Sequence, residues 1–114
     1  MTAPLFKLFQ MKRYVIDLDN TLCDTKQNSD ESWNYIQALP FPDRIKKVNQ
    51  LADEGNHIII ETARGFWTKR NWYVETYDQL TSWGLKFHEL RVGVKFAADY
   101  YIDDKAINSE DFFR

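Results

Sequence analysis

A short apolar run, Tyr14-Val15-Ile16, leads directly into two acidic residues, Asp17 and Asp19, which are separated by one leucine. Tyrosine, valine and isoleucine favour buried strand positions, so we predict a central strand over about residues 13–18 that opens into a loop. In an open parallel sheet, ligands bind at the carboxyl ends of the strands, where these acids would lie. Two carboxylates so close repel each other, and a hard divalent cation would offset that repulsion. The alternative is ordinary turn chemistry, in which Asp and Asn side chains bond to their own backbone.

Composition limits the kind of protein that this chain can be. Its 114 residues suffice for one domain with one core, and we treat residues 1–114 as that domain. The formal net charge of -2 gives no overall attraction to nucleic acid, and no apolar run reaches the ~18 residues of a membrane span. The lone Cys23 fits a reducing cytoplasm. Aromatic residues make up 16% of the chain, more than so small a core buries, so we expect a homo-oligomer joined through an aromatic surface.

Predicted strands and helices alternate along the chain. Residues 1–12 form an N-terminal extension, and residues 22–42 form a polar stretch that we interpret as a short lid or loop insert. Periodicity predicts helices from an N-cap at Asp43 to Gly55 and from Trp67 to Trp83, and further strands over 57–62, 89–92 and 99–104. The strand over 57–62 is apolar enough to be buried on both faces. This order predicts a three-layer, Rossmann-like α/β domain with a small, mainly parallel sheet and helices on both faces.

Such a sheet brings the polar residues that follow its strands to one edge. The residues expected there are Asp17, Asp19, Thr62, Lys95, Asp103 and Asp104. The set offers acids for a cation, a hydroxyl and an ammonium group for an anion, and a carboxylate that can attack. Magnesium with a phosphate is the natural occupant, because Mg²⁺ is usually held by a few carboxylates and by phosphate oxygens. Glu61 precedes Thr62, and strand alternation would point its side chain away from that of Thr62, toward a basic partner.

These residues resemble the four motifs of the haloacid dehalogenase (HAD) superfamily of aspartate-nucleophile phosphatases, in their proper order. The motifs are Asp17-Leu18-Asp19-Asn20-Thr21, a strand ending in Thr62, Lys95, and Ile102-Asp103-Asp104. The resemblance covers residues 13–106, and the short chain is similar to the minimal branch that has no large cap. Thr62-Ala63-Arg64-Gly65 and the segment from Tyr101 to Ala106 further resemble small HAD proteins of phages and of bacterial capsular polysaccharide gene clusters.

The resemblance implies a magnesium-dependent phosphomonoester hydrolase that acts on a small phosphorylated metabolite such as a sugar phosphate. Asp17 would be the nucleophile that forms an aspartyl phosphate, and Asp19 the general acid and then the general base. Thr62 and Lys95 would bind the phosphoryl group. Asp103 and Asp104 would hold Mg²⁺ together with Asp17 and the backbone carbonyl of Asp19. Arg64 would be a second phosphate contact, or else a surface ion pair.

Other functions remain compatible with the sequence. A nucleic-acid 3'-end phosphatase uses the same chemistry, although strand binding normally requires a basic groove. A phosphotransferase differs only in its acceptor. A non-catalytic binding or assembly module could retain the fold, but it would not need both Asp17 and Asp19, and this chain has both.

Overall fold

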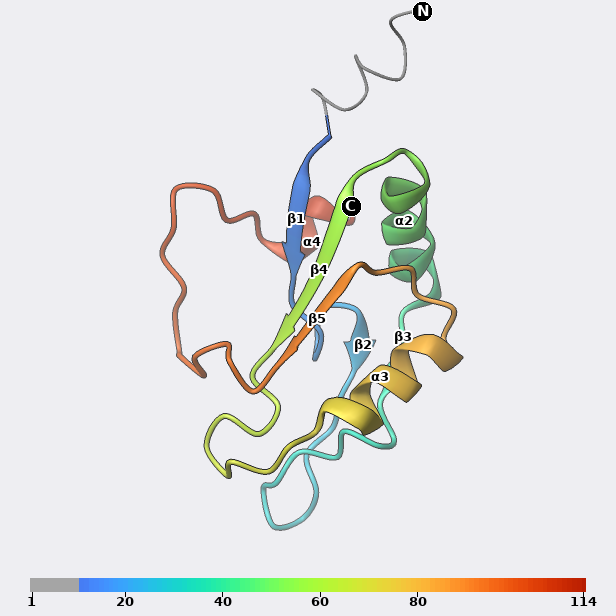
Figure 1. Ribbon diagram of the computed structural model, residues 1–114. Coiled ribbons are helices and arrows are strands. Elements are labelled where there is room, and N and C mark those ends of the chain that lie inside the picture. Colours follow the sequence, from blue (N-terminus) through green and yellow to red (C-terminus); the bar gives the residue numbers. More distant parts are fainter. Residues whose placement is uncertain (1–10) are drawn as a thin grey trace, which may run out of the picture.

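A small parallel sheet forms the centre of the computed structural model, which describes residues 11–114, so that most of the predicted N-terminal extension lies outside it (Figure 1). Its strands are β1 (Arg13–Ile16), β4 (His57–Thr62) and β5 (Glu89–Val92), with β4 in the middle. All neighbours run parallel, and their carboxyl ends meet at one edge. The predicted α/β class and the positions of these three strands are therefore confirmed.

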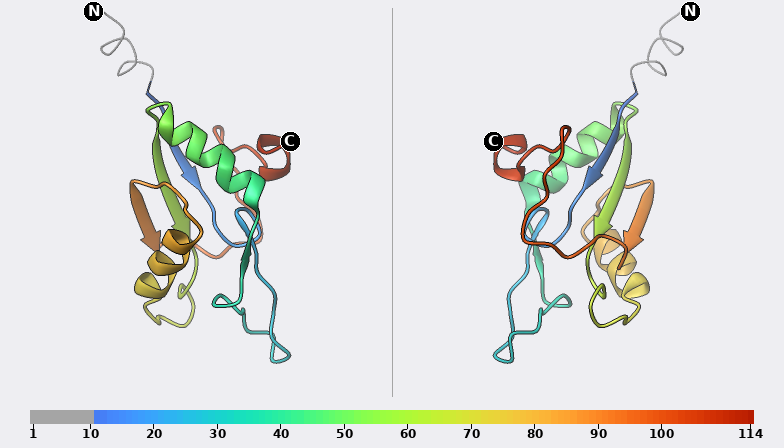
Figure 2. Two further views of the ribbon diagram at one scale, coloured as in Figure 1. Left: turned by 90° about the vertical axis from the view of Figure 1, so that its right-hand side faces the viewer. Right: turned by 90° about the vertical axis from the view of Figure 1, so that its left-hand side faces the viewer.

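The described helices all lie on one face of this sheet (Figure 2). They are α2 (Pro42–Asp53), which packs on β4, α3 (Tyr73–Ser82), which packs beside β5, and the short α4 (Ser109–Phe112). Phe112 of α4 contacts Tyr14 of β1, with ring centroids 6.0 Å apart. The prediction of three layers with helices on both faces is therefore wrong for residues 11–114, which form two layers.

Burial along the strands follows this one-sided arrangement. Ile58 and Ile60 are fully buried against the helices, whereas Val15 on the opposite face is 63% exposed. The prediction that the strand over 57–62 is buried on both faces is thus wrong, because half of its side chains point to the open face. On that face Arg91 Nε lies 3.3 Å from Glu61 Oε2, the basic partner that strand alternation predicted.

Local sequence accounts for most helix boundaries. α2 begins with Pro42 in its first turn, where a missing N–H is no loss, and ends before Gly55, which has φ +96°. Its N-cap is Phe41 rather than Asp43, which lies inside the first turn. α3 starts later than Trp67, at Tyr73, because a loop with left-handed residues precedes it. Among the described residues, no helix combines the length and apolar character that crossing a bilayer requires.

The predicted strand over 99–104 does not form. This segment belongs to the connection that leaves β5, swings out past β1 and returns to α4 (Figure 1). Tyr100 and Ile102 are 84% and 97% exposed. Three consecutive apolar residues supply strand propensity, but a strand also needs a partner for its backbone, and none is paired with this segment.

Residues 22–42 form a projecting hairpin. β2 (Cys23–Asp24) pairs antiparallel with β3 (Leu39–Pro40), and Gln27 bridges Trp33 farther out. We call residues 25–38 the arm. It extends beyond the carboxyl ends of the sheet strands, where a lid over the site would have to lie (Figure 2).

Candidate active site

A tight turn after β1 presents the two acids. Leu18 between them is fully buried, so Asp17 and Asp19 both point away from the core. Asn20 adopts φ 61°, a left-handed conformation that asparagine tolerates, and its side-chain oxygen accepts the Thr25 N–H at 3.1 Å. The turn chemistry that the sequence left open is therefore present at Asn20, whereas both carboxylates bond to side chains.

Asp17 lies at the carboxyl end of β1 with 34% of its side chain exposed. Lys95 Nζ is 3.0 Å from its Oδ1, and the Thr21 hydroxyl donates to its Oδ2 at 3.0 Å. Gly93, with φ 76°, turns the chain after β5 and donates its N–H to the Thr62 carbonyl at 3.0 Å, which brings Lys95 back over the strand ends. The structure thus places an accessible carboxylate beside an ammonium group.

Asp19 is held by a buried arginine. Arg64 Nη2 donates to Oδ1 at 2.8 Å and Nε to Oδ2 at 3.0 Å, and only 1% of the Arg64 side chain is exposed. The Thr25 hydroxyl donates to Oδ1 at 2.6 Å, and the Thr62 hydroxyl lies 3.5 Å from Oδ2. Arg64 is therefore not in a surface ion pair; its side chain is buried and is an internal partner of Asp19. Thr62 does reach the site, as expected for a strand-end residue.

The other side of Arg64 connects Asp19 to α3 and to the arm. Arg64 Nη1 donates to Gln79 Oε1 at 2.8 Å and to Thr76 Oγ1 at 3.3 Å. Gln79 Nε2 donates in turn to the Tyr35 carbonyl at 2.8 Å, and the Arg64 guanidinium lies 4.7 Å from the Tyr35 ring centroid. Sequence analysis missed these partners. The available signal was Thr76, a polar residue on the otherwise apolar face of α3, which needs a polar contact.

Cys23 and Tyr35 respond to this buried environment. Burial raises the pKa of the Cys23 thiol from 9.0 to about 11, and the nearby Asp19 charge contributes to the increase. Burial and the Asp19 charge also raise the pKa of Tyr35 above its ordinary value. The Cys23 thiol therefore keeps its proton at neutral pH and supplies no nucleophilic thiolate.

Asp103 and Asp104 do not join the other acids. Both lie in the exposed connection after β5, where the pKa of Asp103 is lowered, first by the Lys105 backbone N–H. Asp104 Oδ2 instead contacts Lys105 Nζ at 3.1 Å. Within residues 11–114 no three His, Cys, Asp or Glu side chains gather to hold a metal ion. The donors present therefore do not fit a magnesium site in this conformation.

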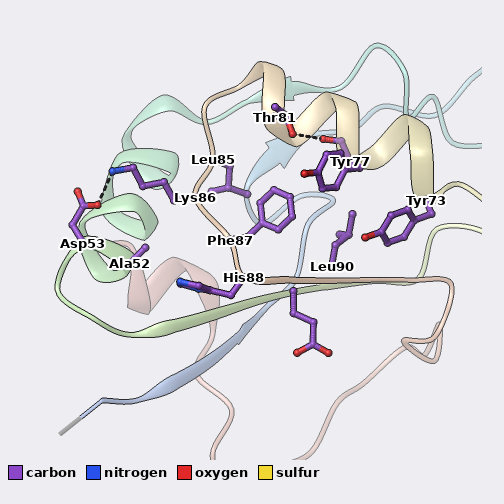
Figure 3. Close-up of a pocket in the computed structure, with 11 residues that line it drawn as sticks. Ala52, Asp53, Tyr73, Tyr77, Thr81, Leu85, Lys86, Phe87, His88 and Leu90 are labelled. Carbon is purple, nitrogen blue, oxygen red and sulfur yellow. Dashed lines mark hydrogen bonds and ion pairs between the residues drawn. The ribbon is translucent and has the colours of Figure 1, made fainter. Parts of the chain in front are cut away.

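Two hollows lie near α3. One, of about 680 Å³, borders the start of β5 and includes Tyr73, Tyr77 and His88 in its wall (Figure 3). It is on the side of the sheet's amino ends, away from Asp17. The other, of about 540 Å³, is lined in part by Ala63 and Gly65, the two neighbours of Arg64 in the chain, and therefore borders the loop that carries Arg64.

Comparisons with known proteins extend the description of the fold. No family model matches the chain, and no curated protein matches it. The chain is similar to a crystal structure of a structural-genomics target from Vibrio cholerae, with a TM-score of 0.75 and 27% sequence identity over 90% of this chain and 88% of that one. The name of that protein states no activity, so the likeness supports the mixed α/β fold over nearly the whole chain and leaves function to the site.

Proposed function

We propose that this chain is a HAD-type phosphatase that hydrolyses phosphomonoesters of small metabolites, such as sugar phosphates, through an aspartyl phosphate on Asp17. The observation that carries the proposal is the 3.0 Å contact between Asp17 and Lys95 at the carboxyl end of β1. An accessible carboxylate can attack a phosphorus atom, while an ammonium group beside it neutralises the phosphoryl oxygens.

The chemistry proceeds in two displacements. An Asp17 oxygen bonds to phosphorus as the bond from phosphorus to the ester oxygen breaks, and the departing oxygen takes a proton from Asp19. Water then attacks the phosphorus of the aspartyl phosphate, Asp19 accepts the proton of that water, and inorganic phosphate leaves with Asp17 restored. Lys95 stabilises the negative charge in both displacements.

Asp19 has to move for this role. Its two oxygens are engaged by Arg64 and Thr25, so neither faces a leaving group next to Asp17. The proposal therefore includes a rearrangement in which the Asp19 carboxylate turns out of the Arg64 contact and takes up a proton from solvent when a substrate is bound, so that it can protonate the departing oxygen.

Magnesium belongs to the proposal through the sequence and the resemblance, and not through the geometry, because Asp103 and Asp104 lie in an exposed segment that does not join Asp17. None of the steps above involves the metal, so the assay has to determine whether it is required. Replacing Asp103 and Asp104 together with asparagine is the direct test: loss of a magnesium-stimulated rate would show that the exposed segment moves to the site.

The experiment is phosphate release from acetyl phosphate and from hexose phosphates, with and without magnesium. Asp17→Asn is expected to abolish release, whereas Asp53→Asn, a change in an exposed ion pair on α2, should leave it intact. Asp19→Asn should slow breakdown of the intermediate, so acid-quenched protein should carry a hydroxylamine-labile phosphoryl group. A folded wild-type protein that releases phosphate from none of these compounds, or an active Asp17→Asn variant, would contradict the proposal.

A second candidate is a non-catalytic binding or assembly module. The specific observation in its favour is the buried Arg64–Asp19 contact, which gives Asp19 a structural reason to be present. The same assay separates the two, because the module predicts no turnover at any metal concentration. A 3'-phosphorylated oligonucleotide added to the ester panel tests the nucleic-acid alternative.

A further inference from the structure

Aromatic side chains line the cavity of about 540 Å³ beside Arg64, which we call the aromatic pocket. Its walls come from the arm, from the loop after β4 and from the residue before α3. The aromatic members are Trp33, Tyr35, Phe66, Trp67 and Trp72. A cavity of this size holds far more than a phosphate group, and it is within the range of small-molecule sites.

The aromatic pocket and the candidate active site share one stretch of chain. Ala63 and Gly65 line the pocket, and the residue between them is the Arg64 that binds Asp19. Phe66, which also lines the pocket, packs on Phe96, the residue that follows Lys95; their ring centroids are 4.6 Å apart. The pocket wall is thus joined to both segments that carry Arg64 and Lys95, and this is our reason for placing the rest of a substrate there when its phosphate lies at Asp17 and Lys95.

The charge of the lining favours an uncharged occupant. Arg70 is the one charged side chain among the described lining residues, and its guanidinium already covers Trp72 at 3.8 Å from the ring centroid. The other polar members carry amides or hydroxyls: Asn28, Ser32, Asn34 and Thr68. Apolar ring faces next to amides and hydroxyls suit a group that has both C–H faces and hydroxyls.

The orientation of the rings separates a sugar from a nucleobase. Tyr35 and Trp72 meet at 81°, and Phe66 and Trp67 meet at 80°. No two of these neighbouring rings form a parallel slot, the arrangement that sandwiches a flat base. Rings set at right angles instead form a corner, which a thick, chair-shaped ring fills on two sides.

We propose that the aromatic pocket binds the sugar ring of the substrate, a hexose phosphate whose phosphoryl group is placed at Asp17. This assignment rests on the proposed phosphatase function. The C–H face of the sugar packs on Trp67, which is 72% exposed and so available to a ligand, and the sugar hydroxyls bond to the amide and hydroxyl side chains. Trp67 is thereby a specificity-determining residue.

The four tryptophans allow a binding test that needs no catalysis. Trp33, Trp67 and Trp72 line the aromatic pocket, whereas Trp83 packs against the core and serves as an internal control. Titration of ¹⁵N-labelled protein with methyl hexosides, which carry no phosphate, should shift the indole N–H signals of the three lining tryptophans and leave that of Trp83 in place. Adenosine, titrated in parallel, should shift them less.

Kinetics then link the pocket to the reaction. Trp67→Ala should raise KM for a hexose phosphate about tenfold more than it raises KM for acetyl phosphate, which is too small to fill the pocket. Tyr73→Ala, which removes an exposed aromatic residue from the other hollow, should change neither KM.

The two proposals fail in different ways. Indole shifts without turnover of any ester would overturn the phosphatase function and leave a sugar-binding site. Turnover without indole shifts, or equal effects of Trp67→Ala on KM for the hexose phosphate and for acetyl phosphate, would overturn the pocket assignment while the phosphatase stands. Larger shifts with adenosine than with any hexoside would overturn the sugar in favour of a base.

Discussion

Arg64 and Asp19 form a forked ion pair below the candidate active site, with Arg64 Nη2 2.8 Å from Asp19 Oδ1 and Arg64 Nε 3.0 Å from Asp19 Oδ2. The side chains are 1% and 21% exposed, respectively, so water compensates little for the loss of either one. A buried charge without its partner is strongly destabilising, whereas the intact pair is close to neutral.

Replacing Arg64 should therefore cost more free energy of unfolding than its position in a loop suggests. We expect Arg64→Met to lower the free energy of unfolding by on the order of 3 kcal/mol in urea denaturation. Arg114→Met, which breaks an exposed pair with Asp111, should change it by less than about 0.5 kcal/mol. Adding Asp19→Asn to Arg64→Met should cost little more, with a coupling energy of about 1–3 kcal/mol. Strictly additive losses would contradict the pair.

Gln79 links the Arg64–Asp19 pair to the arm, and two substitutions separate its two contacts. Gln79→Glu keeps an acceptor for Arg64 Nη1 but cannot donate to the Tyr35 carbonyl; Gln79→Leu loses both contacts. Both variants should speed hydrogen exchange of the arm amides, while those of α2 stay protected. Only Gln79→Leu should also lower the free energy of unfolding by about 1 kcal/mol or more, because it leaves part of Arg64 unpaired. Unchanged exchange in the arm with Gln79→Glu would show that the arm is held by other contacts.

Short-range sequence patterns were enough to predict the three strands of the sheet and α2, but not α4, beside which Phe113 packs on the core. β4 contains three consecutive isoleucines, of which Ile58 and Ile60 point inward, and α2 repeats Ile45 and Val48 at helical spacing. The segment 99–104 has an equally apolar run, but pairing decides whether such a run becomes a strand, and pairing depends on residues far away in the chain. The predicted homo-oligomer likewise depends on a second copy and stays a prediction.

The residues of the candidate site likewise fall into those that follow a predicted strand and those whose contacts depend on distant parts of the chain. Asp17, Thr62 and Lys95 follow strands that the sequence predicts, and parallel strands necessarily bring their carboxyl ends together. Arg64 follows a strand too, yet its side chain turns inward because Thr76 and Gln79 of α3 offer acceptors. A single sequence does not reveal which of several nearby cations finds buried acceptors.

Lys95 should be required for turnover by the proposed phosphatase. Its Nζ is 3.0 Å from Asp17 Oδ1, and its side chain is 20% exposed, so its charge is only partly screened. We expect Lys95→Met to lower kcat/KM for phosphate esters by about 10²- to 10³-fold, with Lys95→Arg recovering part of the loss. Lys86→Met breaks a more exposed lysine–aspartate pair, with Asp53, and should leave kcat/KM unchanged. An equal loss in both variants would indicate a general effect on folding.

Gly65 should tolerate no side chain. It has φ +82°, and a Cβ there would lie 2.1 Å from the Arg70 carbonyl oxygen, a backbone atom that moves only with the whole loop. Gly55 has φ +96° with open space around it, so a side chain there would meet backbone strain but no clash. Gly55→Ala is therefore the control for the strain alone. We expect Gly55→Ala to lower the free energy of unfolding by about 1 kcal/mol, and Gly65→Ala to lower it distinctly more. Equal losses would mean that the loop adapts freely.

Cys23 should make stability depend on pH at the alkaline end. Burial raises the pKa of its thiol from 9.0 to about 11 in the folded protein, so between these values the unfolded chain releases a proton that the folded protein keeps. Stability contributed by the neutral thiol is complete below pH 9.0 and is lost as the pH rises toward 11, by on the order of 2 kcal/mol.

The measurement compares wild type with Cys23→Ala by urea denaturation below pH 9.0 and near pH 11. Tyr35, whose pKa is also raised, titrates in both proteins, so its contribution cancels in the difference. The free energy of unfolding of the wild type, relative to that of Cys23→Ala, should fall as the pH rises. Only the wild type has a thiol whose ionisation favours the unfolded chain. A constant difference would show that the Cys23 thiol reaches solvent in the folded protein. Because the Cys23 sulfur lies 3.8 Å from Asp19 Oδ1, solvent would then also reach the buried side of Asp19.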